Sequence, residues 1–149
     1  MSRTILLAFG VALAAAPSGA PSAGSVQLRA TLNVRNERVV SNHAGGHGAG
    51  RFTATIAGRQ MTWRLTFSRL SSPPIAAHIH LGRFDQIGRV LVGLCTSGEH
   101  RCVSATGGVI TRNWSAIIRA AKAERIYVDI HTRRRPDGEI RGQLVRVRG

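Results

Sequence analysis

The chain has 149 residues, of which 43% are hydrophobic, and its formal net charge is +14 at pH 7. The hydrophobic content excludes a disordered chain, and the length suits one domain with a single core. The basic residues are nearly all arginine and cluster only at Arg133–Arg135, which favours a diffusely charged surface; binding to an anionic surface is the alternative.

The N-terminus has the three parts of a signal peptide. A basic start with Arg3 precedes an uncharged apolar run over residues 5–16, and small residues dominate residues 16–25. The run is too short to cross a bilayer, which needs about 20 apolar residues, and no later segment of the sequence is long and apolar enough to do so. We expect residues 1–24 to be a signal peptide and residues 25–149 to be the mature domain, periplasmic or secreted in a bacterium. The alternatives are an uncleaved anchor and a disordered tail.

Alternating apolar and polar residues predict a series of short strands. These strands cover residues 26–35, 50–56, 61–67, 75–81, 89–94, 125–132 and 139–148. Turn residues at 57–60 indicate a hairpin between the second and third strands. Residues 113–123 form the one good helical pattern, with Asn113 placed to cap it. The pattern predicts an all-β, Greek-key-like sandwich or barrel with one short helix before the penultimate strand.

Cys95 and Cys102 are the only cysteines in the sequence. Two closely spaced cysteines in an exported chain predict a disulfide, which would close the short loop between them. A metal-binding pair is the alternative interpretation, although the spacing between the two residues is not that of a usual cysteine metal knuckle.

The candidate chemistry lies in two predicted strands that carry histidines. His78 and His80 share one face of their strand because successive side chains alternate in direction. Two imidazoles separated by one strand residue can bind the same metal ion. The same alternation places Tyr127, Asp129 and His131 on one face of a later strand.

If these two strands are neighbours, His131 becomes a third ligand. Asp129 or Glu139 could then orient an imidazole by accepting its second N–H. Imidazole ligands suit copper and zinc, and an oxidising exported setting favours copper, with zinc as the alternative. Three histidines would leave a fourth position for water or substrate. The simpler interpretation is that all three are hydrogen-bonded polar residues, and His43 and His47, in a glycine-rich connection, are weaker candidate ligands.

Several segments resemble a CHRD domain, the module named after chordin. Residues 77–82 (Ala-His-Ile-His-Leu-Gly) and 88–94 are similar to its middle part, and residues 127–132 and 136–144 to its C-terminal signature. The resemblance spans roughly Val26 to Val145. It implies an extracellular or periplasmic β-sandwich, found alone in bacteria and repeated in chordin, and it implies no defined activity. The histidine strands also resemble the copper face of copper–zinc superoxide dismutase, at the level of fold analogy alone.

We therefore expect an exported CHRD-domain binding module with a copper or zinc site at His78, His80 and His131. One alternative is a structural or protein-interaction module of the envelope that binds no metal, and another is a copper redox enzyme similar to superoxide dismutase. The sequence shows no nucleophile beside a base and no paired carboxylates, which favours a binding module over an enzyme. The expected partner is an unspecified envelope or extracellular component, not nucleic acid.

Overall fold

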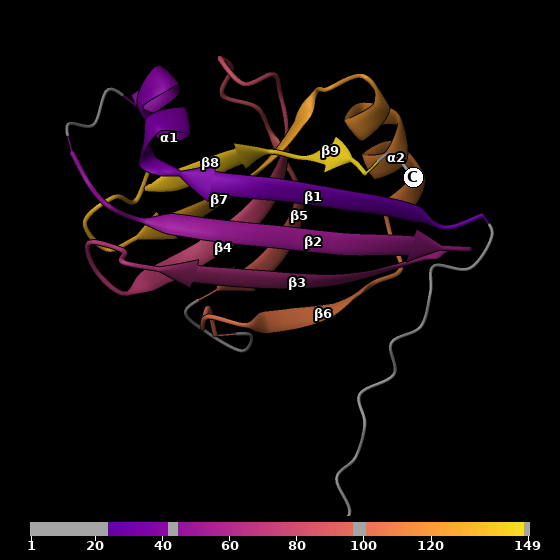
Figure 1. Cartoon of the computed structure of the whole chain (residues 1–149), viewed down its shortest axis with the longest axis horizontal. Helices are drawn as coiled ribbons and strands as arrows, with labels where there is room; N and C mark the ends of the chain where they lie inside the picture. Colours follow the sequence, from indigo (N-terminus) through magenta and orange to yellow (C-terminus); the bar gives the residue numbers. More distant parts are fainter. Residues whose placement is uncertain (1–23, 42–44, 97–100, 148–149) are drawn as a thin grey trace, which may run out of the picture.

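A computed structural model describes residues 24–41, 45–96 and 101–147 of the chain. The elements in these residues are β1 (Val26–Asn33), α1 (Val34–Ser41), β2 (Ala49–Ala57), β3 (Gln60–Ser68), β4 (Pro74–Leu81), β5 (Val90–Thr96), β6 (Thr106–Ile110), α2 (Trp114–Lys122), β7 (Ile126–Thr132), β8 (Ile140–Gln143) and β9 (Val145–Arg146) (Figure 1). The predicted signal peptide, residues 1–24, lies outside the described residues apart from Gly24.

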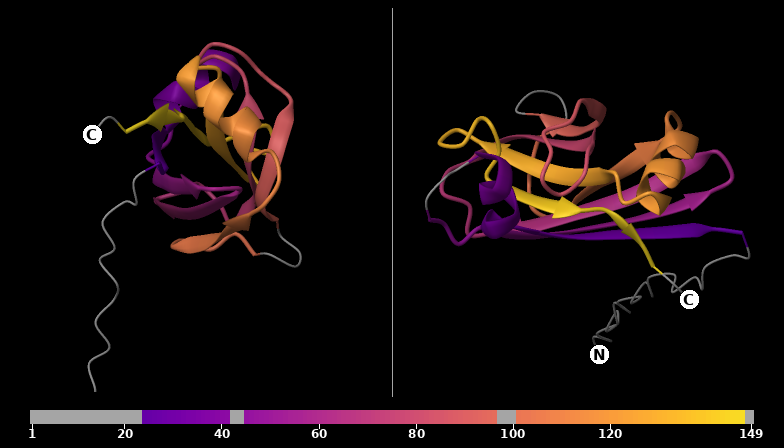
Figure 2. Two further views of the ribbon diagram at one scale, coloured as in Figure 1. Left: turned by 90° about the vertical axis from the view of Figure 1, so that its right-hand side faces the viewer. Right: turned by 90° about the horizontal axis from the view of Figure 1, so that it is seen from above.

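The strands of the described ranges form a single antiparallel sheet. Its order is β5-β4-β7-β8-β1-β2-β3-β6, and β9 also pairs with β1. The sheet curls until its edge strands β5 and β6 line a common groove, so that it forms a nearly closed barrel when seen from its end (Figure 2). This confirms the all-β barrel-type prediction with a short helix, α2, before β7. The last predicted strand, residues 139–148, forms as two pieces, β8 and β9, with buried Leu144 between them.

Apolar side chains at alternate positions of β1, β2 and β3 build the core. Leu28 and Leu32 from β1, Phe52 from β2 and Leu65 from β3 are fully buried. Phe52 also stacks on Trp63, with ring centroids 6.0 Å apart. Each such side chain contributes about 1.5–3 kcal/mol through its burial. The two-residue repeat read from the sequence therefore sets which face of each strand the core covers.

Helix α1 was not predicted from the sequence. It follows β1 directly, and the side chain of Asn33 accepts a hydrogen bond from the backbone N–H of Asn36 at 2.9 Å, as an N-cap residue does. The strand alternation continues as far as Val34, which hid the start of this short helix. The helix carries Glu37, which is buried although its side chain is ionisable.

Helix α2 forms close to the predicted range and Asn113 occupies its N-cap position as expected, but the side-chain cap does not form. Asn113 has a left-handed backbone (φ 59°) and makes no side-chain bond to the helix. Its Nδ2 instead donates to the carbonyl oxygen of Leu91 at 3.0 Å, which ties the start of the helix to β5. The helix packs on the core through Ile117 and Ala121, which are buried.

Cys95 and Cys102 lie at disulfide distance, with the two sulfur atoms 2.06 Å apart. Both side chains are buried in the core. Within the residues that the structure covers, no helix is long and apolar enough to span a membrane.

Candidate metal centre

Strands β4 and β7 are neighbours in the sheet, which is the condition that the sequence left open. Their antiparallel register places His78 opposite Asp129 and His80 opposite Tyr127. The same register places Ala76 opposite His131, and it shifts only beyond this pair, between Pro74 and Ala76. The intervening side chains, Ile79, Val128 and Ile130, are fully buried on the other face. The polar side chains of both strands therefore gather on one side of the sheet.

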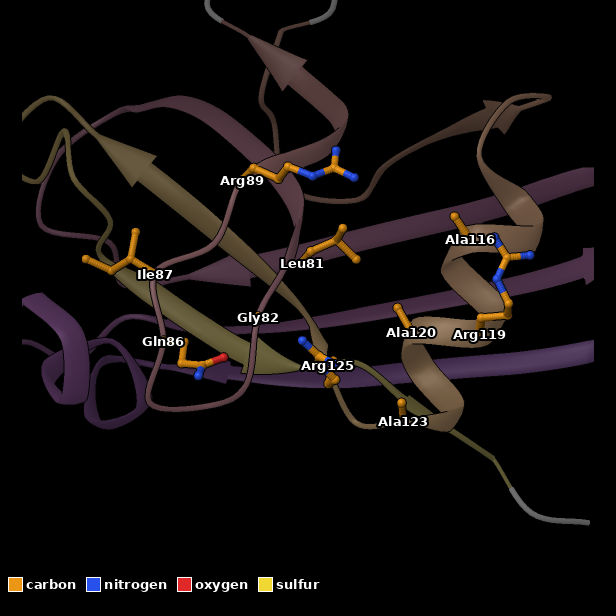
Figure 3. Close-up of a pocket in the computed structure, with 10 residues that line it drawn as sticks. All are labelled: Leu81, Gly82, Gln86, Ile87, Arg89, Ala116, Arg119, Ala120, Ala123 and Arg125. Carbon is orange, nitrogen blue, oxygen red and sulfur yellow. The ribbon is translucent and has the colours of Figure 1, made fainter.

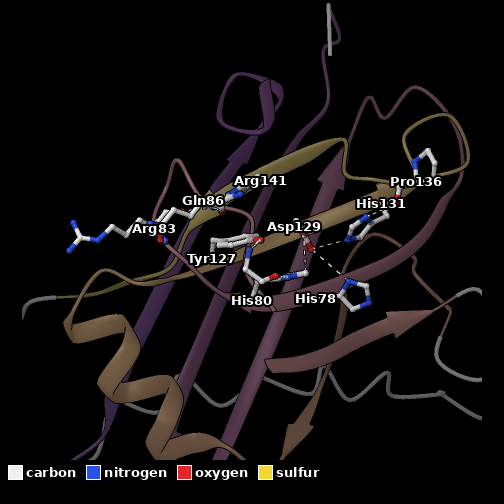
Figure 4. Close-up of polar contacts among 10 residues, drawn as sticks. His78, His80, Arg83, Gln86, Tyr127, Asp129, His131, Pro136 and Arg141 are labelled. Carbon is white, nitrogen blue, oxygen red and sulfur yellow. Dashed lines mark hydrogen bonds and ion pairs between the residues drawn. The ribbon is translucent and has the colours of Figure 1, made fainter. Parts of the chain in front are cut away.

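Three imidazoles surround the carboxylate of Asp129 (Figure 4). Nε2 of His80 lies 3.1 Å from Oδ2, Nε2 of His131 lies 3.2 Å from Oδ1, and Nδ1 of His78 lies 3.9 Å from Oδ1. One nitrogen from each imidazole and one carboxylate oxygen all lie within 4.8 Å of one another. We call His78, His80, Asp129 and His131 the histidine cluster.

The backbone holds two of the rings with a defined nitrogen pointing inward. Nδ1 of His80 lies 2.8 Å from the carbonyl oxygen of Gly88, and Nδ1 of His131 lies 2.9 Å from that of Pro136. A carbonyl oxygen only accepts, so each Nδ1 carries a hydrogen and donates it. In the neutral ring the lone pair is then on Nε2, which faces the cluster. Metal-binding histidines are oriented in this way.

Gly88 reaches His80 only because it has no side chain. A Cβ atom at Gly88 would overlap the backbone carbonyl of Leu81, across the narrow turn that joins β4 to β5. The backbone N–H of Gly88 also donates to the hydroxyl oxygen of Tyr127 at 3.1 Å. The carbonyl that orients His80 is therefore fixed on both sides.

The inward atoms of the cluster lack good hydrogen-bond partners. Nδ1 of His78, Nε2 of His80, Nε2 of His131 and Oδ1 of Asp129 are all buried without an aligned partner. The inward Nε2 lone pairs of His80 and His131 repel the carboxylate of Asp129, and buried unsatisfied polar groups cost free energy. A cation among them, either a proton or a metal ion, removes this repulsion. The donor set of imidazoles and one carboxylate fits a transition metal.

The electrostatics of the metal-free cluster agree with this requirement. Burial lowers the pKa of His80 and of His131, but the Asp129 carboxylate outweighs it and leaves both pKa values above the ordinary range. Burial would raise the pKa of Asp129, yet His131 and His80 hold that pKa down to about 2. Burial lowers the pKa of His78; the charge of Asp129 opposes this shift, and the two other imidazoles add to it. Asp129 thus stays ionised and attracts positive charge.

A buried polar layer continues from the cluster toward β8. The ring of Tyr127 stacks on His80 with centroids 4.9 Å apart, and the guanidinium carbon of Arg141 lies 3.3 Å above the centre of the Tyr127 ring. Nη2 of Arg141 donates to the carbonyl oxygens of Arg83 and Gln86. This fixes the loop that contains Gly88. Sequence reasoning did not identify Arg141, or the carbonyl groups of Arg83 and Gln86, as part of this layer, because their roles depend on loop geometry.

The remaining candidate residues lie in different environments. Asp129, expected to orient an imidazole from outside, lies among the ligand atoms themselves. Glu139 contacts no imidazole among the described residues, because its carboxylate accepts from the backbone N–H of Ser71 and the hydroxyls of Ser71 and Thr132. His47 is exposed and is not part of the cluster, and His43 lies outside the described residues.

A nearly closed antiparallel barrel carries a cluster of three histidines and one aspartate, of which His80 and Asp129 are buried, and this defines a β-domain with a candidate metal centre. The family model of the CHRD domain matches residues 28–144, which include every strand that builds the cluster, and the chain belongs to this family. No curated protein and no solved structure matches the chain. A CHRD domain and a disulfide are both typical of an extracellular or secreted domain.

Proposed function

We propose that this CHRD domain is a metal-binding module that holds copper through His78, His80 and His131, with Asp129 completing the set of ligands. The observation that carries the proposal is the convergence of four ligand atoms within 4.8 Å, two of them on rings whose other nitrogen is held by a backbone carbonyl. Such an arrangement lowers the cost of ordering the ligands before the metal binds.

Copper is proposed over zinc because divalent copper binds most tightly in the first-row series. Imidazole and carboxylate ligands also accept zinc, so zinc is the competing ion. A bound ion would supply positive charge to the four facing ligand atoms. The chain's own residues contribute orientation through Gly88 and Pro136 and exclusion of water through burial; Asp129 is only 4% exposed.

The test measures metal content and affinity directly. Protein freed of metal with a chelator and then loaded is expected to retain one copper per chain after gel filtration, and to prefer copper when zinc is equimolar. His78→Ala and His131→Ala should lose this copper. The matched control is His47→Ala, which removes an exposed histidine outside the cluster. Retention of stoichiometric copper in both cluster variants would refute the proposal, as would equal loss in the control.

We also propose that the domain works outside the cytoplasm after removal of residues 1–24. The Cys95–Cys102 pair supports this, because disulfides persist in oxidising compartments. Mass spectrometry of protein secreted or released from the periplasm is expected to show a mature chain that begins near Ser25 with both thiols blocked. An intact N-terminus and two free thiols would contradict export.

A further inference from the structure

A second candidate site lies between helix α2 and the loop that joins β4 to β5 (Figure 3). It is an open pocket of ≈ 740 Å³. This volume is in the range of small-ligand sites. Its lining residues are Leu81, Gly82, Gln86, Ile87, Arg89, Ala116, Arg119, Ala120, Ala123 and Arg125. Nothing in the proposed metal function uses this pocket.

Three arginines from three different parts of the chain surround the pocket. Arg89 precedes β5, Arg119 lies on α2, and Arg125 precedes β7. No acidic residue lines the pocket, and the three guanidinium groups make no ion pair with any residue that the structure describes. Arginine presents several planar N–H donors that match the oxygens of a phosphate. The charge of the pocket therefore complements a phosphate-bearing anion.

The same pocket is apolar between its arginines. Leu81 and the small side chains of Ala116 and Ala120 leave room along α2. On the facing loop, Ile87 is 79% exposed, and its neighbours Phe84 and Val90 are 64% and 48% exposed. These are three of the six exposed large hydrophobic side chains among the described residues. Apolar side chains held in water beside basic ones are typical of surfaces that bind membranes.

The pocket is shaped before any ligand binds. The backbone N–H of Gly82 donates to the carbonyl oxygen of Arg125 at 3.0 Å, and that of Leu81 donates to the carbonyl oxygen of Arg89 at 3.0 Å. On its other side, the loop accepts two hydrogen bonds from the buried Arg141. Binding therefore needs little ordering of the loop, which favours affinity.

We propose that this pocket binds the phosphate of an anionic phospholipid at a membrane surface, through Arg89, Arg119 and Arg125. Ile87 then lies at the boundary between the headgroups and the acyl chains. Two acids lie near the pocket in the sequence, Asp85 and Glu124, but neither lines it. The inference is independent of the metal centre. The net charge of the chain suggested binding to an anionic surface without a location, and the pocket supplies that location.

Vesicle co-sedimentation tests the proposal with the full mature chain. Binding is expected to vesicles that contain phosphatidylglycerol and not to vesicles of phosphatidylcholine alone. Each arginine near an anionic surface strengthens binding by roughly fivefold, so the double variant R119Q/R125Q should bind at least tenfold more weakly. I87S should weaken binding at unchanged net charge. The melting temperature of each variant, which should stay near that of the parent, serves as the folding control.

The matched control is R29Q/R64Q, which removes two exposed arginines from β1 and β3 at the same cost in net charge. An equal loss of vesicle binding in this control would mean that the protein adsorbs through its net charge, and would refute the pocket as the binding site. Soluble glycerol phosphate should not displace the protein from vesicles at micromolar concentration; if it does, the ligand is a free anion and the membrane is not the partner. H78A should keep vesicle binding, which separates this site from the metal centre.

Discussion

Oδ2 of Asp129 lies 3.1 Å from Nε2 of His80, a ring whose other nitrogen is already hydrogen-bonded to Gly88. His80 therefore faces a negative charge with the one nitrogen that is free to bind a cation. Asp129 does the same for His131 on its other oxygen, at 3.2 Å. One carboxylate thus sets the charge of the whole cluster.

Replacing Asp129 with asparagine should keep the shape of the side chain but remove its charge. We expect copper affinity to fall about 10–100-fold, the usual effect of losing a carboxylate that ligates or orients a metal-binding group. Competition with a chelator of known affinity measures this loss. Asp85→Asn, at an exposed loop position, is the control and should bind copper as the parent does. An Asp129→Asn variant with unchanged affinity would remove Asp129 from the site.

Gly88→Ala tests whether the backbone carbonyl orients His80. The new methyl group would overlap the carbonyl of Leu81, so the loop must move and Nδ1 of His80 loses its acceptor. Copper affinity is expected to fall roughly tenfold or more. Gly93→Ala, on β5, is a sharp control because an added Cβ there has no other atom within 4 Å. If both variants bind copper equally well, the Gly88 carbonyl does not position His80.

Copper should stabilise the folded protein because an ion held by β4 and β7 together binds the native state alone. With free copper at about 100 times its dissociation constant, the gain is about 2.7 kcal/mol. For a chain of this size the melting temperature should rise by roughly 5–10 °C. Thermal unfolding with and without a chelator measures the shift. His131→Ala should abolish it, whereas His47→Ala should keep it.

Glu37 should make stability depend on pH. Burial raises the pKa of Glu37 to about 7, with the charge of Asp129 as the next cause, whereas in the unfolded chain the pKa is near 4.5. The native state therefore favours the protonated form. This contribution is fully present below about pH 4.5 and is lost as the pH rises through 7. In metal-free protein, Glu37→Gln should accordingly gain stability relative to the parent between pH 5 and pH 8, by roughly 1–3 kcal/mol.

Urea unfolding at the two pH values measures this difference. Glu124→Gln, at an exposed position, is the matched control. Its free energy of unfolding should equal that of the parent at both pH values. An identical pH dependence in the parent and Glu37→Gln would show that the Glu37 carboxyl ionises as readily in the folded chain as in the unfolded one.

Removing the disulfide tests how much the short loop contributes to the fold. Closing a loop of this length restricts the unfolded chain by about 2–3 kcal/mol. The variant Cys95→Ala with Cys102→Ala should therefore lose about 2–3 kcal/mol of unfolding free energy in urea titrations, with copper affinity nearly unchanged because neither residue belongs to the histidine cluster. A large loss of copper in this variant would mean that the loop also supports the cluster.

The sequence predicted the strands and the three histidines because both depend on local alternation. The faces of His78 and His80, and of Asp129 and His131, follow directly from a two-residue repeat. The adjacency of β4 and β7 did not follow, because strand order is decided by packing across the whole sheet. The resemblance to CHRD domains made the fold predictable beyond what alternation alone supports.

The contributions of the loops were not predictable. Glu139 has the right residue type and strand position for a contact with an imidazole, but Ser71 and Thr132 satisfy its carboxylate. Nothing in the amino-acid sequence marks the backbone carbonyl groups of Gly88 and Pro136 as hydrogen-bond acceptors for the two imidazoles. Helix α1 was not predicted because the strand alternation continues to Val34, where the structure begins a helix with the Asn33 side chain accepting from the backbone N–H of Asn36.

The two strands that hold the cluster are far apart in the chain, since β5, β6 and α2 all lie between β4 and β7. A β4–β7 pair is therefore a non-local contact, and contacts of this kind form slowly. If this pairing forms after the rate-limiting step, copper has no assembled ligands to bind on the way to the folded state. Copper should then slow unfolding while leaving the refolding rate nearly unchanged, as expected for an interaction that is absent from the transition state. In stopped-flow measurements only the unfolding arm of the chevron should move.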